Sequence, residues 1–330
     1  MPLWILGFLF LIIKLAVVLL VLLFGAAYLV FLERRLLGFM QVRLGPNRAG
    51  PWGLLQPLAD TVKLLLKEDF VPQGADRVIF RYAPAVVAAM ALLIFAVVPF
   101  GQGWTYGGKP IPLVICDLNV GVLFVIALTS ISVYGVALGG WASNNKYSLL
   151  GGIRAAAQMI SYEIALGLAL IPVVMLAGSF SLVDITEAQS PFPFILLQPL
   201  AFIIFFISGL AEMKRIPFDI PEAENELVAG YHTEYSGMRF GLYFIGEYVS
   251  MLILGSLVAV FFLGGWRGPF LPPILWFIIK VGVSVFALIW FRATFPRLRY
   301  DQLMYFGWKV LIPLALLNII VTGGVMLAVS

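Results

Sequence analysis

The sequence has little of the chemistry on which most redox and metal-dependent proteins rely. Its 330 residues contain one cysteine, Cys116, and one histidine, His232. A single cysteine excludes an internal disulfide, and there is no Cys/His cluster to hold zinc, an iron–sulfur centre or haem. No P-loop lysine motif occurs, and the glycines of GQGWTYGGK (101–109) do not fit a nucleotide fingerprint. If the protein takes part in redox chemistry, the redox centres and nucleotides therefore belong to partner proteins.

Charged residues are also scarce. They make up 12% of the chain, about half of the ~25% that is usual in soluble domains. Hydrophobic residues make up 62%, and the mean hydropathy is +1.02. A soluble core is excluded by apolar runs such as residues 4–32, and the small net charge of +4 gives no indication of nucleic-acid binding. The composition predicts an all-α, polytopic membrane protein.

Apolar segments long enough to span a bilayer recur along the whole chain. A spanning helix needs about 20 mainly apolar residues. Eight segments approach this length, and they are residues 5–32, 78–100, 112–138, 155–178, 193–212, 240–264, 271–293 and 305–328. We therefore predict one integral membrane domain over residues 1–330, with two long polar loops at 33–77 and 212–239.

The basic residues indicate the orientation of this bundle. The loops after the first, third, fifth and seventh predicted spans hold 17 of the 21 lysines and arginines. The other loops hold only Lys109 and Arg267. By the positive-inside rule, the basic loops face the cytoplasm and both termini face the outer side.

The first cytoplasmic loop contains an amphipathic segment, GLLQPLADTVKLLLKEDF (53–70). Its apolar residues recur at helical spacing, namely Leu54, Leu58, Val62, Leu65 and Leu66. Its charged side chains forbid spanning, so the pattern predicts a helix that lies in the membrane interface. Such a helix is either a surface anchor or part of a portal for a lipid-soluble molecule.

Acidic residues gather around the second long loop, EMKRIPFDIPEAENELVAGYHTEYSG (212–237). Seven of the 17 acids lie between residues 212 and 247, and they are Glu212, Asp219, Glu222, Glu224, Glu226, Glu234 and Glu247. One interpretation is a solvated acidic loop. The other is a folded segment, because Ile216-Pro217-Phe218 and Ile220-Pro221 place bulky apolar residues among the acids. Clustered carboxylates that are buried titrate as a coupled set.

Ionisable residues also fall inside predicted spans. Glu163 and Glu247 lie about two turns in from the cytoplasmic side, and Lys280 lies in the middle of the seventh span. Placing an ionisable side chain at this depth in a membrane costs free energy, so such side chains usually face a bundle interior or water. A buried polar path for protons and a structural ion pair are both open interpretations of the two acids.

Four segments carry a resemblance to a known family. They are residues 33–69, from ERRLLGFMQVRLGPNRAG to LLLKED, 140–163 (GWASNNKYSLLGGIRAAAQMISYE), 215–248 (RIPFDIPEAENELVAGYHTEYSGMRFGLYFIGEY) and 296–309 (PRLRYDQLMYFGWK). The chain resembles, from end to end, the H subunit of bacterial NADH–quinone oxidoreductase, the quinone-chamber membrane subunit of respiratory complex I. The resemblance implies membership of a proton-translocating enzyme of the bacterial inner membrane, in a chain that has no redox centre of its own.

The resemblance also implies roles for individual residues. The interfacial helix would border the quinone entrance, with Arg34, Arg43, Asp60 and Phe218 as cavity or portal residues. A proton relay would lead from Asp219, Glu222, Glu224 and Glu226 towards Glu212, Glu163 and Glu247. Quinone, either ubiquinone or menaquinone, would be the substrate, while FMN and iron–sulfur clusters would lie on partner subunits. The partners would be the quinone-site subunits of the peripheral arm, small membrane subunits and antiporter-like subunits, together with membrane lipids.

Three other classes of protein fit parts of the sequence. A stand-alone cation or proton transporter would also place acids inside helices, although no inverted repeat is visible. A purely structural anchor for a peripheral arm would not need buried acids. The membrane subunit of an energy-converting hydrogenase resembles this family but need not use quinone.

Overall fold

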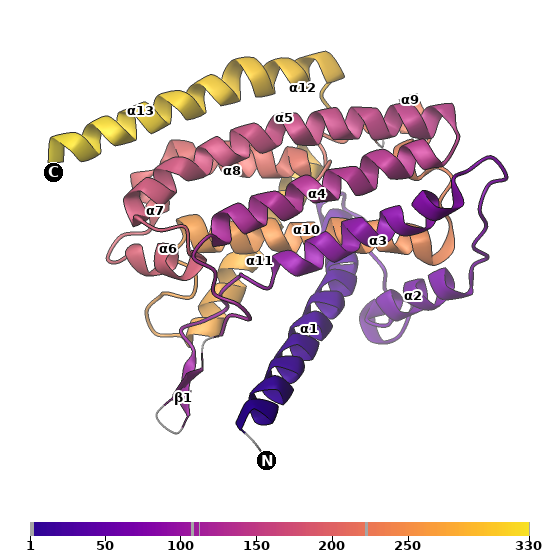
Figure 1. Ribbon diagram of the computed structural model, residues 1–330. Helices are drawn as coiled ribbons and strands as arrows, with labels where there is room; N and C mark the ends of the chain where they lie inside the picture. Colours follow the sequence, from indigo (N-terminus) through magenta and orange to yellow (C-terminus); the bar gives the residue numbers. More distant parts are fainter. Residues whose placement is uncertain (1–2, 107–108, 112, 222–223, 330) are drawn as a thin grey trace.

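The chain folds into a bundle of long helices (Figure 1). A computed structural model describes residues 3–106, 109–111, 113–221 and 224–329. The long helices are α1 (Leu3–Met40), α3 (Arg77–Ile94), α4 (Gly121–Ala142), α5 (Lys146–Ala177), α10 (Gly237–Phe262), α11 (Pro273–Thr294) and a C-terminal run of α12 (Tyr300–Phe306), the π-helical turn η3 (Gly307–Leu311) and α13 (Ile312–Val329). Within the described ranges, seven helices are long and apolar enough to cross a membrane. The prediction of an all-α polytopic membrane protein is confirmed.

The fifth predicted span is divided into two helices. The short α7 (Phe194–Leu197) is followed by Gln198, and α8 then runs over Pro199–Glu212. Proline lacks the N–H that a helix interior needs, but it is tolerated in the first turn, so α8 begins there. With 14 residues, α8 is about 21 Å long, which is less than the ~30 Å hydrocarbon thickness of a bilayer.

The first helix is longer at its C-terminal end than the sequence predicts. The predicted span ends at residue 32 and the predicted loop begins at 33, but α1 continues to Met40. The charged residues Glu33 and Arg34 therefore lie on the helix. The extension is possible because the carboxylate of Glu33 contacts the guanidinium groups of Arg215 and Arg292 and does not need water.

Helix α10 is the centre of the bundle. Its most apolar window is 72% buried, compared with 22% for α1 and 28% for α11. In Figure 1, α3, α4, α5 and α10 run roughly side by side, whereas α1 crosses them obliquely and α13 lies along the outside. The side chains of Phe205, Phe261 and Phe262 pack together in the core between α8 and α10.

Small residues allow two of these helices to approach closely. A Cβ atom at Gly140 of α4 would lie 2.5 Å from the carbonyl oxygen of Ser148 and 3.0 Å from Cα of Gly152, both on α5. Contacts of this kind are typical of helix packing in membranes, where burial from water supplies no driving force. Capping side chains fix the ends of two helices. Asp76 accepts hydrogen bonds from the N–H groups of residues 78 and 79, and Asn145 accepts one from residue 147.

The remaining elements are short. They are η1 (Pro51–Gly53), α2 (Gln56–Leu66), α6 (Leu182–Ala188), α9 (Glu224–Leu227) and η2 (Gly230–His232), with one antiparallel hairpin of β1 (Trp104–Tyr106) and β2 (Lys109–Ile111). The hairpin was not predicted from the sequence. It lies well away from α2 in Figure 1.

Lys280 organises the connection between α10 and α11. Its ammonium donates hydrogen bonds to the carbonyl oxygens of Leu263, Gly265 and Arg267, at 2.6, 2.9 and 2.6 Å. Carbonyls at a helix C-terminus lack partners within the helix. The lysine predicted in the membrane therefore supplies donors to the C-cap residue of α10 and to the connection that follows it.

We predict that Lys280→Met lowers the stability of the assembled protein. Carbonyls that lose a donor inside a folded protein cost about 1–3 kcal/mol. The apparent melting temperature of the purified complex should fall by several degrees, whereas Lys146→Met, at an exposed position, should leave it unchanged. Equal melting temperatures for Lys280→Met and the unmodified complex would contradict a stabilising role of Lys280 in this connection.

Candidate functional site

A cluster of alternating charges lies where α1, α10 and α11 meet the connection after α8. The guanidinium of Arg215 contacts Oε1 of Glu33 at 2.5 Å through Nη1, and Oε1 of Glu247 at 2.6 Å through Nε. Arg292 of α11 pairs with the same oxygen of Glu33. The ring of Tyr248 lies 4.6 Å from the guanidinium carbon of Arg215. We call Glu33, Arg215, Glu247 and Arg292 the charged cluster.

Burial makes this cluster energetically important. The side chain of Glu33 is 1% exposed and that of Arg215 is 6% exposed. Burial by itself lowers the pKa of the Arg215 guanidinium, but the charges of Glu247 and Glu33 outweigh it and raise the pKa overall, so the group stays protonated. Removing one partner of a buried ion pair is strongly destabilising, because a charge is then left without compensation.

The charged cluster borders a cavity of about 290 Å³. The other lining residues include Arg34 and Leu37 of α1, and Tyr231, His232 and Tyr243. We call this space the charged cavity. It is mixed in character, with two acids, three arginines, a histidine and several aromatic rings in its wall.

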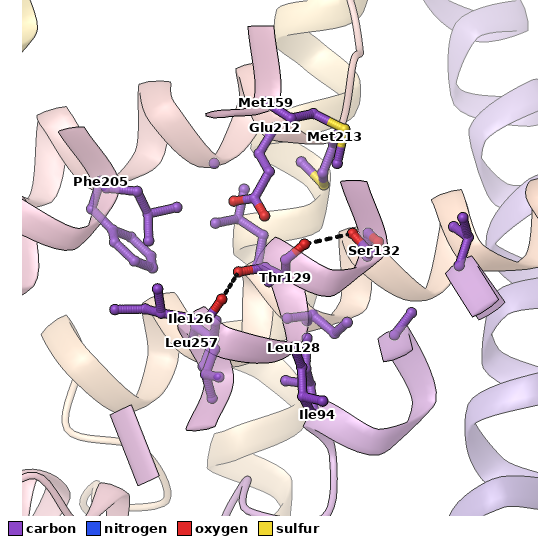
Figure 2. A pocket seen from close by; sticks show the side chains of 18 residues that line it. Ile94, Ile126, Leu128, Thr129, Ser132, Met159, Phe205, Glu212, Met213 and Leu257 are labelled. Carbon is purple, nitrogen blue, oxygen red and sulfur yellow. Dashed lines mark hydrogen bonds between the residues drawn. The ribbon is translucent and has the colours of Figure 1, made fainter. Parts of the chain in front are cut away.

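A second cavity lies deeper in the bundle, between α3, α4, α5, α8 and α10. Its volume is about 70 Å³, which gives room for about two water molecules, at about 30 Å³ each. Figure 2 shows the carboxylate of Glu212 pointing into this inner cavity towards Thr129, with Ser132 next to it. The hydroxyl of Thr129 donates to the carbonyl of Ile126 at 2.8 Å.

Glu163 lies on the neighbouring helix α5. Its carboxylate accepts a hydrogen bond from the hydroxyl of Ser130 on α4. Ser130 adjoins Thr129, so adjacent residues of α4 face the two acids. The structure therefore brings Glu163 and Glu212, which the sequence analysis grouped together, to one region of α4.

Gln158 holds the connection between the two cavities in place. It is fully buried on α5, and its Nε2 donates to the carbonyl oxygens of Ala211 and Phe218, both at 2.8 Å. The amide of Gln158 thus binds the backbone before and after Arg215 and fixes the turn between them. The N–H of Phe218 also donates to the carbonyl of Arg215 at 2.7 Å.

Lys214 lies within the same turn and is buried. Its φ of 56° falls in the left-handed region, which is uncommon for a residue other than glycine. Its ammonium donates to the hydroxyl of Tyr231 at 2.6 Å and lies 4.3 Å from the centre of that ring. The geometry directs Lys214 towards Tyr231, while Glu212 faces the inner cavity and Arg215 faces the charged cavity.

Two of the predicted portal residues meet next to the charged cavity. Arg34, in the cavity wall, pairs with Asp60 of α2 at 2.8 Å, and Asp60 also accepts a hydrogen bond from Gln56 at 2.9 Å. The helix α2 is amphipathic as predicted. Arg43 lies in the exposed turn after α1, where it donates to Gln41 at 2.7 Å.

The apolar side of α2 is not covered by the described part of this chain. Leu58, Leu65 and Leu66 are 62%, 61% and 81% exposed. An uncovered row of leucines on a helix with charges opposite is what an interfacial location requires.

Phe218 lies in a different pocket from Arg34 and Asp60. Together with Pro217 it lines a space of about 740 Å³ between α8, the end of α11, α12 and η3. We call this space the aromatic pocket. The ring of Phe218 also packs against Tyr162, at 5.5 Å between centroids.

The remaining predicted acids lie apart from both cavities. Asp219 pairs with Arg297 at 3.0 Å, and Glu226, which is 56% exposed, pairs with Arg154 at 2.6 Å. Glu222 and the side chain of Glu224 lie outside the described residues, so their predicted roles stay predictions. In the described part of the chain, no group of three or more His, Cys, Asp and Glu residues could hold a metal ion.

Sequence reasoning missed several residues of this site. Glu33, Arg215 and Arg292 are not among the site residues predicted from the sequence. Glu33 lies 182 residues before Arg215 and 259 before Arg292. The one available signal was the acid at the start of ERR (33–35), directly after an apolar run. Gln158 gave no signal, because a single glutamine in a helix has no distinctive pattern.

The fold and the two cavities define a polytopic membrane protein with a buried charged site. The family model described as NADH dehydrogenase matches residues 13–323. The chain is 69% identical over 320 residues to the second of the NADH-quinone oxidoreductase H subunits of Syntrophobacter fumaroxidans, with 97% of each chain covered. It is 64% identical to the second H subunit of the same enzyme in Geobacter sulfurreducens (96% of each) and 63% identical to the first H subunit in Geobacter metallireducens (95% of each).

These matches extend over nearly the whole chain. The protein therefore belongs to the family of H subunits of NADH–quinone oxidoreductase, or complex I, and is one component of a multi-subunit oxidoreductase.

We predict that Gln158→Met weakens the connection after α8. Methionine fills a similar volume but donates no hydrogen bond, so two carbonyls lose their donor, at about 1–3 kcal/mol. The apparent melting temperature of the purified complex should fall. Ser208→Ala is the matched control, because this buried hydroxyl on α8 has no hydrogen-bond partner in the described structure. A fall in melting temperature of equal size in both variants would contradict the role of Gln158 in holding this turn.

Proposed function

We propose that this protein forms the entrance and part of the cavity for quinone, and couples quinone reduction to proton translocation through its buried carboxylates. The observation that carries the proposal is the position of the charged cavity. On one side it adjoins the interfacial helix through the pair Arg34–Asp60, and on the other side it is bounded by the pair Arg215–Glu247. Quinone is the substrate. FMN and iron–sulfur clusters belong to partner subunits of the peripheral arm.

The entrance is supported by α2. A lipid-soluble molecule in the bilayer reaches the protein at its apolar surface, and α2 offers an uncovered row of leucines beside the polar pair Arg34–Asp60. A quinone has an apolar tail and a polar head, and this combination suits both surfaces. Arg43 extends the basic character of the same edge. Phe218 lines the aromatic pocket and not the charged cavity, so it is not part of the proposed entrance.

The coupling is supported by the chain of groups around that connection. Reduction of a quinone to a quinol takes two electrons and two protons, so it changes the local demand for protons. If Glu247 gains a proton, Arg215 loses half of its counter-charge and its position changes. Glu212 ends α8 three residues before Arg215, and adjacent residues of α4, Thr129 and Ser130, face Glu212 and Glu163. A shift at the charged cavity then changes the surroundings of the inner cavity, which is the physical requirement for coupling two sites.

The proposal extends to location and partners. The basic loops face the cytoplasm of a bacterial cell, the span-bearing domain lies in the inner membrane, and both termini face the periplasm. The quinone-site subunits of the peripheral arm bind over the charged cavity, while antiporter-like and small membrane subunits bind at the sides of the bundle. The relatives are named as subunits of a quinone oxidoreductase, which favours this function over that of a hydrogenase anchor or a separate transporter.

We predict that Glu247→Gln lowers NADH-to-quinone electron transfer by about tenfold or more, equivalent to ~1.4 kcal/mol or more in the barrier. The neutral amide cannot balance Arg215, whereas NADH-to-ferricyanide transfer bypasses the quinone cavity and should persist. Glu226→Gln is the control, because its exposed pair with Arg154 lies away from the cavities and its effect should be smaller. Full quinone activity in an assembled Glu247→Gln complex would refute the proposed role of the cluster.

We also predict that Asp60→Asn raises the apparent KM for quinone several-fold without changing stability. The Arg34–Asp60 pair is partly exposed, and such pairs contribute only about 0–1 kcal/mol. Asp69→Asn is the comparison variant, since Asp69 pairs with Arg239 at 3.0 Å, and Arg239, unlike Arg34, does not line the charged cavity. If the two variants raise KM equally, the effect reflects the general charge of the loop and the entrance assignment fails.

A further inference from the structure

The aromatic pocket is distinct from both cavities of the proposed quinone site. It shares no lining residue with either of them. Six of its wall residues are Phe206 and Ile207 of α8, Phe291 of α11, Phe295 directly after it, and Tyr305 and Phe306 of α12. Among the lining residues, only Asp301 and Gln302 carry a carboxylate or an amide, and both lie in the first turn of α12. The pocket is therefore an apolar space with one polar end.

Water is not a suitable occupant of such a space. A volume of about 740 Å³ equals roughly 25 molecules of liquid water, at about 30 Å³ each, but apolar cavities stay dry. Phe291, Phe295 and Tyr305 are still 37%, 50% and 58% exposed, so the pocket opens at the surface of the bundle. The walls come largely from membrane-spanning helices, whose surroundings are hydrocarbon.

A helix of a neighbouring protein does not fit inside the pocket. A helix with its side chains is about 10 Å across, so 740 Å³ holds a cylinder only about 9 Å long, or some six residues. A flexible hydrocarbon chain fits this volume much better, because it has a small cross-section and can follow an irregular aromatic wall.

The charges at the polar end identify the head group. Arg299 is fully solvated and pairs with Asp301 at 2.7 Å, and Arg297 is matched by Asp219. Lys309 is exposed, and its ammonium lies 4.8 Å from the centre of the Tyr305 ring. Among these described groups, the positive charge exceeds the negative charge by one. An isoprenoid quinone carries no charge for this position, whereas every phospholipid carries a phosphate.

We propose that the aromatic pocket binds a hydrocarbon chain of a membrane phospholipid, whose phosphate lies against Lys309 and Arg299. Basic side chains at the membrane surface attract lipid phosphates in this way. The bound hydrocarbon chain packs against Pro217 and Phe218, which line the pocket. It therefore stabilises the turn after α8 on the side opposite Arg215, which faces the charged cavity. The site does not depend on the proposed quinone function.

The test uses the purified NADH–quinone oxidoreductase complex in lipid nanodiscs. The probe is phosphatidylethanolamine with a diazirine on one acyl chain, and the labelled peptides are identified by mass spectrometry. We expect labelling of peptides from α8 and from residues 291–310. Ile207→Trp fills the pocket and should reduce this labelling by about fivefold or more. Ile203→Trp is the matched control, because residue 203 lies one turn earlier on α8, is 50% exposed and does not line the pocket.

A second variant keeps the test decisive if Ile207→Trp fails to assemble. Val310→Phe fills the pocket from η3 and should have the same effect. Lys309→Met removes the head-group contact and should weaken labelling by the phospholipid. Three results would overturn the proposal. They are equal labelling in Ile207→Trp and Ile203→Trp, labelling by a quinone with a photoreactive tail but not by the phospholipid, and cross-linking of a diazirine residue at position 310 to a neighbouring protein and not to lipid.

Discussion

The guanidinium of Arg215 is the interaction on which the arrangement of this site depends. It is almost completely buried and bound by one carboxylate from α1 and one from α10. An arginine presents its donors in a fixed planar fork, so it sets the distance and the orientation of both acids in a way that a lysine would not. Because Glu33 and Arg215 are both removed from water, removing either one leaves a buried charge without its partner.

The side chains of one short segment, residues 212–218, face three different spaces, namely the inner cavity, the charged cavity and the aromatic pocket. Glu212 ends α8 and faces the inner cavity, Lys214 contacts Tyr231, Arg215 enters the charged cavity, and Phe218 lines the aromatic pocket. The backbone of this turn is held by donors from Gln158, which lies on another helix. A tight turn with a different environment on each side transmits a displacement between them more directly than a long loop would.

Much of this architecture could be predicted from the sequence, because it depends on local chemistry. Apolar length predicts the spanning helices, and leucine spacing predicts α2. The division at Gln198–Pro199 is visible in principle, since proline begins helices well and interrupts them badly. The acidic stretch contains bulky apolar residues that favour a folded segment, and two of them, Phe218 and Ile220, are buried. Its geometry could not be predicted, because the partners of Arg215 are set by packing between helices far apart in the chain, and hydropathy carries no information about such pairs.

The position of Glu33 has a consequence for how the protein is made. Its two basic partners are synthesised 182 and 259 residues later, so α1 is made long before the charge near its C-terminal end can be neutralised. Until α11 is in place, that end of α1 must stay near the aqueous surface, where water can solvate the carboxylate. A chain that stops before residue 292 would leave Glu33 with one of its two arginines missing, a defect that membrane quality control could detect at the very beginning of the protein.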